Sequence, residues 1–216
     1  MSEAALLEVK DLTCERGYRR LFSQLNFQLR RSEVLRITGA NGTGKTSLLN
    51  ILAGLSSQYD GEIFFQGETA RKAQAERAEL MTYLAHDKAV KLNLTVLENL
   101  QWYQALYPCK ALSNDDLLAV LEQLGLKAYR MHRASDLSAG QRQRIALARL
   151  LISDAKLWIL DEPFTAIDQS GVKQFETIIA NFAKAGGAVI ITAHHALSIE
   201  ANYRELELSD LQEGDN

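Results

Sequence analysis

The apolar residues of this chain follow two different periods, and each period predicts a different kind of element. Near the N-terminus, four short segments show partial alternation of apolar and polar residues and are separated by Gly, Arg and Ser. This pattern is typical of β-strands, which we predict at residues 6–13, 24–29, 34–38 and 62–66. Because the four segments lie close together in the sequence, we expect them to form an antiparallel layer.

Two later segments, 157–160 and 188–191, are almost entirely apolar. Apolar runs of this length are typical of parallel strands that are buried on both faces, so we expect them at the centre of a sheet. Between the early and the late strands, residues 96–106 and 117–124 have helical spacing. The chain is therefore predicted to be an α/β protein with a helical subdomain inserted at about residues 87–137.

The composition fits one globular domain over residues 1–216, because 47% of the residues are apolar and 24% are charged. No apolar run reaches the roughly 18 to 20 residues that a membrane helix requires, and residues 1–4 lack the basic region of a secretory signal. We therefore expect the chain to stay in the cytosol without inserting into a membrane. The acidic C-terminal residues 205–216 are expected to fray.

Charge and cysteine content exclude further classes of protein. The formal net charge of −3 argues against a protein that binds nucleic acid regardless of sequence, because such proteins carry a strong basic excess. Cys14 and Cys109 have neither the spacing of a metal site nor that of a paired redox motif. We expect both to be reduced thiols without a chemical role.

Residues 39–46 fit the phosphate-loop template Gly-x-x-x-x-Gly-Lys-[Ser/Thr], after a predicted strand and before a helical pattern that ends at Gly54. The glycines let backbone N–H groups converge on phosphate oxygens, and Lys45 reaches the outer phosphates. Thr46 would supply a hydroxyl group to Mg²⁺. A glycine-rich turn beside an unrelated lysine would not explain the strand and the helix. The predicted nucleotide-binding residues are Gly39, Ala40, Asn41, Gly42, Thr43, Gly44, Lys45, Thr46 and Ser47.

A pair of acids follows the apolar run at 157–160. The predicted strand ends on Asp161 and Glu162, and Pro163 prevents it from pairing further. Asp161 is predicted to lie near Mg²⁺, and Glu162 to polarise the water that attacks the γ-phosphate. Taken alone, Asp-Glu-Pro could equally be a solvent-exposed turn; the phosphate loop favours the nucleotide interpretation.

Residues 137–141 precede a helical pattern over residues 142–152, and Ser138 and Gln141 are spaced as a capping box. A capping box does not require Gly140, and a glycine in the first turn of a helix costs about 1 kcal/mol relative to alanine. We interpret Ser138, Ala139, Gly140 and Gln141 as a segment whose backbone approaches the γ-phosphate of ATP. The alternative is a well-capped helix without a ligand.

In this order, the three motifs resemble those of the nucleotide-binding subunits of ATP-binding-cassette (ABC) transporters, and the resemblance covers nearly the whole chain. It implies a P-loop ATPase of α/β class, with a mixed or parallel central sheet, an antiparallel β layer and an inserted helical subdomain. Residues 165–168 are similar to the D-loop of the family, which implies a nucleotide-binding role for Asp168. His194 is similar to its switch histidine, which contacts the γ-phosphate, whereas His195 carries no such argument.

The chain departs from the family pattern at two positions. Most members have a glutamine after the strand that precedes the helical subdomain, where this chain has His86. The resemblance implies that His86 orients the attacking water or contacts the Mg²⁺ shell, as the glutamine would. The position of the aromatic residue that stacks on adenine is occupied by Arg16, with Tyr18 two residues later, and either side chain could stack on the base.

His86 and the segments 14–16 and 94–100 are similar to those of the ATPase subunits of cytochrome c maturation systems. This resemblance implies a peripheral ATP hydrolase on the cytoplasmic face of the inner membrane, with ATP and Mg²⁺ as ligands and no nucleic-acid partner. Two copies would enclose two ATP–Mg²⁺, each between the phosphate loop of one chain and Ser138 to Gly140 of the other. An integral membrane subunit (CcmB-like) and further cytochrome c maturation membrane proteins would be its partners, in haem export or in the release of a haem-loaded chaperone.

The residues themselves do not indicate haem, because the chain has no Cys-x-x-Cys-His pattern. One alternative is the ATPase subunit of another ABC importer or exporter. A second is a soluble ABC ATPase that acts as a clamp on nucleic acid or ribosomes, which the single cassette and the lack of sustained heptads disfavour. The intact Glu162 disfavours a nucleotide sensor that does not hydrolyse ATP.

Apolar and aromatic residues near His86 could form a docking surface for a helix of the membrane subunit. The alternative is that they pack inside the protein. The residues concerned are Leu92, Leu94, Trp102, Tyr103 and Tyr107.

Overall fold

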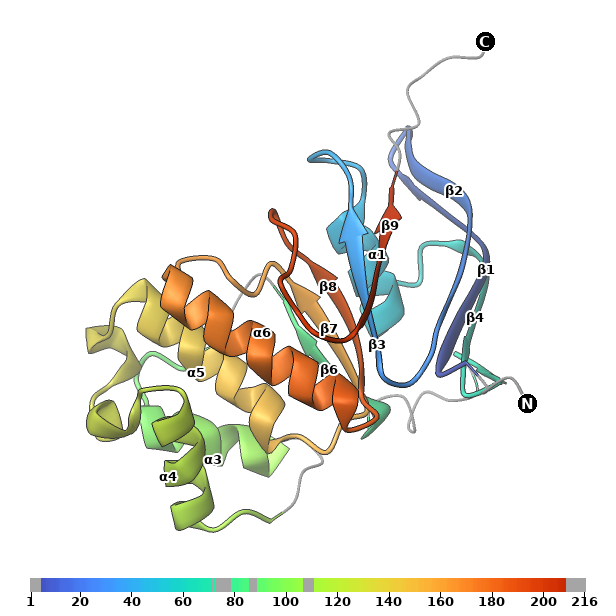
Figure 1. The fold of residues 1–216 in the computed structure, drawn as a ribbon. Coiled ribbons are helices and arrows are strands. Elements are labelled where there is room, and N and C mark those ends of the chain that lie inside the picture. The colour runs from blue at the N-terminus through green and yellow to red at the C-terminus, as the bar shows by residue number, and fades with distance from the viewer. Residues whose placement is uncertain (1–4, 71, 73–78, 86–88, 107–110, 209–216) are drawn as a thin grey trace.

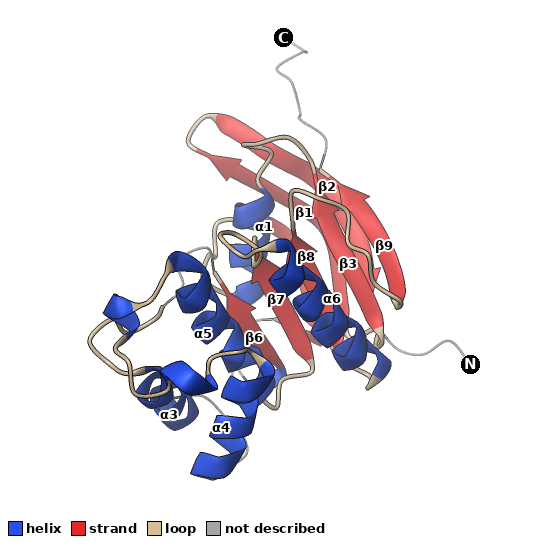
Figure 2. Cartoon of the chain, turned by 60° about the vertical axis from the view of Figure 1, so that its left-hand side comes forward, coloured by secondary structure: helices blue, strands red, loops and turns tan. Residues whose placement is uncertain are grey.

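Helix α1 (Lys45–Ala53) lies between two β-sheets, and the other long helices cover the opposite face of the larger sheet (Figure 1). The computed structural model describes residues 5–70, 72, 79–85, 89–106 and 111–208. Figure 2 shows the same arrangement turned by 60°, with α1 on one face of the larger sheet and the other labelled helices on the opposite side. None of the described helices is both long and apolar enough to cross a membrane.

The smaller sheet is antiparallel and has the strand order β2-β1-β4-β5. Its strands are β1 (Leu7–Arg16), β2 (Arg19–Leu29), β4 (Asp60–Phe65) and β5 (Glu68–Thr69). The predicted antiparallel layer is therefore confirmed for three of its four segments, with β1 and β2 several residues longer than predicted because they meet in a tight turn at Gly17.

The larger sheet is parallel throughout and has the strand order β6-β7-β8-β3-β9. Its strands are β3 (Glu33–Thr38), β6 (Met81–Leu84), β7 (Leu157–Asp161), β8 (Ala188–Thr192) and β9 (Asn202–Glu207). The two apolar runs lie near the centre, as predicted. Leu157 and Ile159 of β7 pack on the side of α1, whereas Trp158 and Leu160 pack on the side of the long helices, so successive residues need apolar side chains.

The helices that cover this sheet share one hydrophobic core with it. They are α3 (Val96–Leu106), α4 (Asn114–Gln123), α5 (Ala139–Ile152) and α6 (Gln169–Lys184), with short 3₁₀ turns at Lys127–Tyr129 and Ala134–Asp136. Leu100 of α3 and Leu121 of α4 belong to the same buried cluster as Trp158 of the sheet. The predicted helical segment thus packs as part of the main core, and its limits at 87 and 137 stay a prediction.

The prediction that residues 34–38 join the antiparallel layer is wrong. In the structure this segment is β3, which pairs in parallel with β8 and β9. The chain leaves the antiparallel sheet at Ser32, whose φ is 60° and whose amide donates a hydrogen bond of 2.8 Å to the carbonyl of Gly187. Closeness in sequence did not decide the pairing, because the partners of β3 lie at residues 188–192 and 202–207, near the end of the described chain.

The expectation that the chain frays from residue 205 is also wrong for its first residues. Glu205 and Glu207 belong to β9, which forms the edge of the larger sheet beside β3. One side of an edge strand faces solvent, so alternating acidic residues are compatible with it. Residues 209–216 lie outside the described residues.

Candidate functional site

The phosphate loop connects the end of β3 to the start of α1. Gly39 has a φ of 136°, and a Cβ atom on it would lie 2.5 Å from the carbonyl oxygen of Leu208, so a larger residue would not fit. The ammonium group of Lys45 donates hydrogen bonds of 2.8 Å to the carbonyl oxygens of Gly39 and Ala40. Thr43 is buried, and its hydroxyl group also donates to Ala40, at 3.0 Å. The loop is therefore held closed around the lysine.

The N-terminus of α1 differs from those of α4, α5 and α6. Ser113, Ser138 and Asp168 cap those three helices with side-chain oxygens. Among the described residues, α1 has no side-chain cap and no acidic residue in its first turn, since its N-cap is Gly44. Its first N–H groups thus have no protein side-chain acceptor, which suits an anionic ligand such as a phosphate group.

A cavity of about 340 Å³ opens over this loop. Glu162 reaches it from the end of β7, so the proposed base and the lysine share one cavity. Arg16 also lies on its wall, whereas the side chain of Tyr18 is fully exposed at the turn between β1 and β2. The lining residues are Arg16, Leu21, Asn41, Gly42, Gly44, Lys45, Thr46, Ser47 and Glu162.

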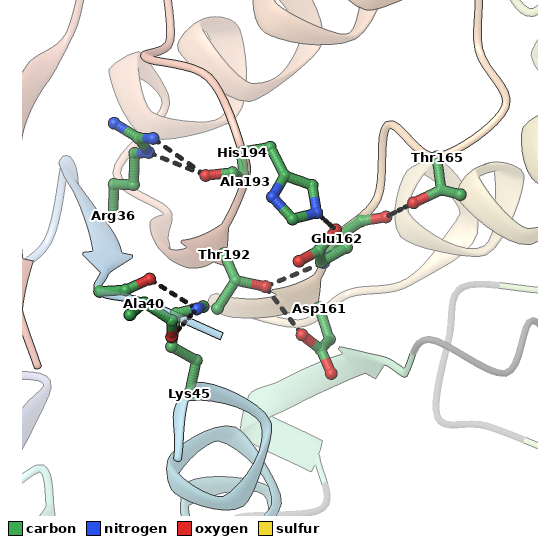
Figure 3. A network of polar contacts seen from close by, with 10 residues as sticks. Arg36, Ala40, Lys45, Asp161, Glu162, Thr165, Thr192, Ala193 and His194 are labelled. Carbon is green, nitrogen blue, oxygen red and sulfur yellow. Dashed lines mark hydrogen bonds and ion pairs between the residues drawn. The ribbon is translucent and has the colours of Figure 1, made fainter. Parts of the chain in front are cut away.

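Asp161 is almost fully buried at the end of β7, with 3% of its surface exposed. Its Oδ1 accepts a hydrogen bond of 2.8 Å from the hydroxyl group of Thr192 (Figure 3). Its Oδ2 is buried and has no hydrogen-bond partner among the described residues. A buried carboxylate oxygen without a donor fits a cation ligand, and one carboxylate together with a hydroxyl group and phosphate oxygens is the usual donor set of Mg²⁺.

No group of three or more His, Cys, Asp or Glu residues that could hold a metal ion by themselves occurs in the part of the chain that the structure describes. A Mg²⁺ ion at this position would take most of its ligands from phosphate oxygens and water. Thr46, on the cavity wall, and Asp161 are the residues present that fit it.

Glu162 adopts a backbone conformation that is uncommon for a non-glycine residue, with a φ of 49°. Its amide donates a hydrogen bond of 2.9 Å to the hydroxyl oxygen of Thr192. Its Oε2 lies 2.6 Å from Nε2 of His194, which follows β8 (Figure 3). The turn after β7 therefore directs the carboxylate out of the strand and toward both the phosphate-loop cavity and the histidine.

His194 and Glu162 also line a second cavity of about 230 Å³. His195 shares this wall, together with Phe164 and Thr165. The side chain of His194 is 71% exposed and that of Glu162 is 21% exposed. The two cavities thus share the carboxylate of Glu162, and the imidazole of His194 is accessible to a ligand that enters from the solvent.

The capping box predicted at Ser138 is confirmed. The amide of Gln141 donates to the Ser138 hydroxyl at 3.2 Å, and the Gln141 side chain accepts from the Ser138 amide at 2.9 Å. The helix that it caps, α5, begins at Ala139, three residues earlier than the apolar pattern predicted. The described residues of the phosphate-loop cavity include none of residues 138–141, so the two predicted halves of a nucleotide site are separate within one chain.

Gly140 has a structural reason to be glycine that the sequence did not reveal. A Cβ atom at this position would lie 2.6 Å from the carbonyl oxygen of Ala166, in the turn after β7. Ala166 itself has a φ of 65°. The first turn of α5 therefore packs backbone to backbone against the segment 165–168 of its own chain, before any ligand is considered.

Asp168, predicted to contact nucleotide, already has partners within the chain. It caps α6 through the amide of Gly171, and it forms a 2.9 Å ion pair with Arg144 of α5. Hydrogen bonds from Ser170 and Gly171, with a further contribution from Arg144, hold the pKa of Asp168 below its ordinary value. Its observed contacts connect α5 with α6, and its role toward nucleotide stays a prediction.

His86 lies outside the described residues, so its proposed role is likewise still a prediction. The strand that leads to it, β6, contains Tyr83, whose hydroxyl group donates to Asn50 of α1 at 2.9 Å. Burial, together with the negative charge of Asp161, raises the pKa of Tyr83. The end of β6 therefore lies near the acidic end of β7, as its parallel pairing requires.

Only some of the residues of the predicted docking surface are exposed to solvent. Leu92 is half exposed, and Leu94 and Trp102 are partly buried. The inclusion of Tyr103 is wrong, because its side chain is fully buried and its hydroxyl group donates to the carbonyl of Ala89. Tyr107 lies outside the described residues.

Sequence reasoning missed Thr192, which hydrogen-bonds with both acids of the site. The available signal was a hydroxyl residue that ends a buried apolar strand two positions before His194. It also missed Arg36, a cation within the apolar pattern of β3. A charged residue in a buried strand requires a partner, and that requirement is the signal that could have found it.

Comparisons with known proteins agree with this geometry. The sequence profile of a family described as ABC transporter matches residues 22–165. The chain is 43% identical over 206 residues to the cytochrome c biogenesis ATP-binding export protein CcmA of Hahella chejuensis, covering 95% of this chain and 97% of that protein. It is 45% identical over 194 residues to the protein of the same name from Pasteurella multocida, covering 90% and 91% of the two chains.

The fold is similar to that of solved structures. A putative ABC transporter ATP-binding protein from Pyrococcus furiosus aligns with a TM-score of 0.81 at 25% sequence identity, over 94% of this chain and 96% of that one. The α/β architecture with a parallel sheet, an antiparallel sheet and a covering layer of helices is thus shared with an ATP-binding protein of this kind.

Proposed function

This chain belongs to the ABC transporter family of ATP-binding proteins, and from that premise we propose that it hydrolyses ATP as the peripheral subunit of a transporter in c-type cytochrome biogenesis. The observation that carries the proposal is the meeting of Lys45 and Glu162 at one cavity, beside a buried carboxylate oxygen of Asp161 that has no partner among the described residues. The similarity to CcmA proteins supports the biological role.

ATP would bind with its phosphates over the N-terminus of α1. The N–H groups of the loop and of the first helical turn donate to phosphate oxygens, and Lys45 exchanges its two carbonyl partners for the outer phosphates. Thr46 and Asp161 would hold Mg²⁺, which when bound screens the negative charge of the phosphate oxygens. Arg16, on the cavity wall, is the better placed of the two residues that could stack on adenine.

Glu162 would act as the general base. A water molecule attacks the γ-phosphorus, its proton passes to the Glu162 carboxylate, and the bond from the γ-phosphorus to the bridging oxygen breaks to release ADP and phosphate. His194 contacts the same carboxylate and is exposed, so it can exchange this contact for a γ-phosphate oxygen. The separation of Glu162 and His194 would then depend on whether ATP is bound.

We propose that a second copy of the chain completes each site. Residues 138–141 do not line the cavity of their own phosphate loop, yet α5 presents its N-terminus at the protein surface beside the turn 165–168. In an ATP-bound homodimer, Ser138 to Gly140 of one chain would face the γ-phosphate held by the other. ATP binding closes the dimer, and hydrolysis reopens it.

The membrane context follows from the proposed family role. The chain would act on the cytoplasmic face of the inner membrane, bound to an integral CcmB-like subunit and to further cytochrome c maturation proteins. Haem export and release of a haem-loaded chaperone are both compatible with such a complex, because an ATPase subunit contacts the transporter and not its cargo.

A genetic test addresses the biological role directly. Deletion of the gene in its host should abolish haem-stained c-type cytochromes, and the wild-type chain supplied in trans should restore them. Lys45→Ala and Glu162→Gln should be expressed but fail to restore them. Normal c-type cytochromes in the deletion strain would assign the chain to a different ABC transporter.

A further inference from the structure

We propose that Arg36 is a positioning residue that fixes the orientation of His194, by holding the peptide group that precedes it. The inference rests on the proposed role of His194 in ATP hydrolysis. The juxtaposition that carries it is shown in Figure 3, where the guanidinium group of Arg36 points at the carbonyl oxygen of Ala193.

Arg36 lies in the middle of β3, between β8 and β9, the two strands that lead into and out of the histidine loop (residues 193–201, which include His194). It is in register with Ile191 of β8 on one side and with Glu205 of β9 on the other. Only 11% of its side chain is exposed. A cation this buried is stable only if it is paired and hydrogen-bonded. The groups that pair with Arg36 therefore indicate the role of this residue.

Three nitrogen atoms of the guanidinium group have partners. Nε and Nη2 donate to the carbonyl oxygen of Ala193 at 3.3 and 2.9 Å. Nη1 forms a 2.8 Å ion pair with Oε1 of Glu205. Burial lowers the pKa of Arg36, and hydrogen bonds with Glu205 and Tyr203 outweigh it and raise the pKa overall, so the group stays cationic.

Glu205 is itself fixed, because the hydroxyl group of Tyr203 donates to the same carboxylate oxygen. Hydrogen bonds from Tyr203 and from Arg36 hold the pKa of Glu205 below its ordinary value. The edge strand β9 thereby keeps the guanidinium group pointed across β3 toward the end of β8.

Ala193 is the first residue after β8, and no backbone hydrogen bond to its carbonyl occurs among the described residues. Its C=O belongs to the same rigid peptide plane as the N and Cα atoms of His194. Two donors on one oxygen therefore restrict rotation of the plane from which the histidine side chain projects. On the other side of Ala193, Thr192 is hydrogen-bonded to the two acids of the site.

The functional consequence concerns rate more than affinity. Arg36 does not line the phosphate-loop cavity, so its substitution would remove no side chain from the proposed nucleotide site. A side chain that is misplaced by about 1 Å can slow a reaction by about 100-fold. Substitution of Arg36 should therefore lower kcat and leave the KM for ATP nearly unchanged.

The chain offers a matched control between the same two strands. Arg204 of β9 pairs with the buried Glu33 of β3, which repeats an arginine–glutamate pair across the β3–β9 ladder without contact to the histidine loop. Arg204→Gln and Arg36→Gln each remove one such pair. Only Arg36→Gln also removes the hydrogen bonds to the carbonyl oxygen of Ala193.

The experiment measures ATP turnover of the full chain, with its membrane subunit present if turnover requires it. For Arg36→Gln we expect kcat to fall about tenfold or more with KM within a factor of about two, whereas Arg204→Gln retains the wild-type kcat. In a His194→Ala background, Arg36→Gln should cause no further loss, because it acts through the histidine. Independent, multiplicative losses in the double variant would overturn the proposal.

A spectroscopic measurement tests the same idea without turnover. The chain has four histidines, and the imidazole NMR signal of His194 is identified by its loss in His194→Ala. In the absence of nucleotide, this signal should shift in Arg36→Gln and stay unchanged in Arg204→Gln, while the signal of His132 stays unchanged in both. Arg36→Lys keeps the charge but not the planar guanidinium group, so it should give an intermediate kcat. If Arg36→Gln does not fold, kcat and the NMR signal are measured on Arg36→Lys instead.

A wild-type His194 signal together with a wild-type kcat in each folded Arg36 variant would overturn the inference. Failure of the proposed function has a different signature. In that case His194→Ala would keep the full rate of ATP hydrolysis, or the wild-type complex would not hydrolyse ATP. The NMR shift in Arg36→Gln would still show that Arg36 fixes the peptide group of Ala193.

Discussion

Thr192 donates a hydrogen bond of 2.8 Å to the buried carboxylate of Asp161, its neighbour in register across β7 and β8. The same hydroxyl oxygen accepts a hydrogen bond of 2.9 Å from the amide of Glu162. One hydroxyl group thus connects the acid proposed to hold Mg²⁺ with the backbone of the acid proposed as base. The orientation of both acids therefore depends on β8 as well as on β7.

Replacement of Thr192 by valine should remove both hydrogen bonds at nearly constant volume. The buried Asp161 oxygen and the Glu162 amide would lose their partner, so we expect the free energy of unfolding to fall by about 1 to 3 kcal/mol, together with slower ATP hydrolysis. Urea unfolding measures the first effect. Thr177→Val, which removes an exposed hydroxyl–carbonyl bond within α6, should change stability far less; equal losses in the two variants would contradict a special role for Thr192.

Glu162→Gln should still bind ATP but hydrolyse it about 10² to 10⁴ times more slowly, because a positioned general base contributes about that factor. The ATP-loaded variant should accumulate as a dimer, visible by light scattering or size-exclusion chromatography. Single-turnover hydrolysis measures the chemical step. A wild-type rate in that assay would mean that another group accepts the proton.

Gly140 offers a test of the composite site that separates charge from packing. Any side chain at this position meets the carbonyl of Ala166, so both Gly140→Asn and Gly140→Asp should destabilise the chain, by about 1 to 3 kcal/mol. Only Gly140→Asp adds a negative charge that repels the γ-phosphate of a partner chain. We therefore expect ATP-dependent dimerisation to be weaker in Gly140→Asp than in Gly140→Asn, with ATP binding to the monomer retained in both. Equal dimerisation by the two variants would count against the two-chain site.

The cap of α6 should make stability depend on acidity. Hydrogen bonds from Ser170 and Gly171, and the contact with Arg144, lower the pKa of Asp168 below its ordinary value of 3.8. Because the lowered pKa belongs to the folded state, the stabilisation is present above the ordinary pKa of 3.8 and is lost as the pH falls through the folded-state pKa. Asp168→Asn keeps a capping oxygen without the charge, so the wild type should be the more stable at pH 7 and the difference should vanish once the pH is below the folded-state pKa. A difference that is independent of pH would attribute the effect to hydrogen bonding alone.

The sequence predicted those features that depend on neighbouring residues. The phosphate loop, the acids at the end of β7 and the capping box at Ser138 can each be identified within a few positions, because a turn, a strand end or a helix cap is a local structure. The buried strands β7 and β8 were identifiable for a related reason, since both of their faces are covered by apolar layers.

What the sequence did not predict depends on contacts between distant residues. The pairing of β3 with β8 and β9, and the contact of Gly140 with Ala166, are set by packing that no local pattern encodes. The sequence predicts Glu205 to be part of a fraying acidic end, because its partner Arg36 lies 169 positions earlier. The ion pair of Glu205 with Arg36 can be recognised only once it is known that β9 lies next to β3.

The close approach of Leu208 to Gly39 has a consequence for how the protein is made. The first residue of the phosphate loop is packed against the carbonyl of a residue that the ribosome adds 169 positions later. Until that segment has been synthesised, β3 lacks its β9 neighbour and the loop lacks one of its walls. A nascent chain should therefore acquire its full affinity for nucleotide only when β9 has emerged.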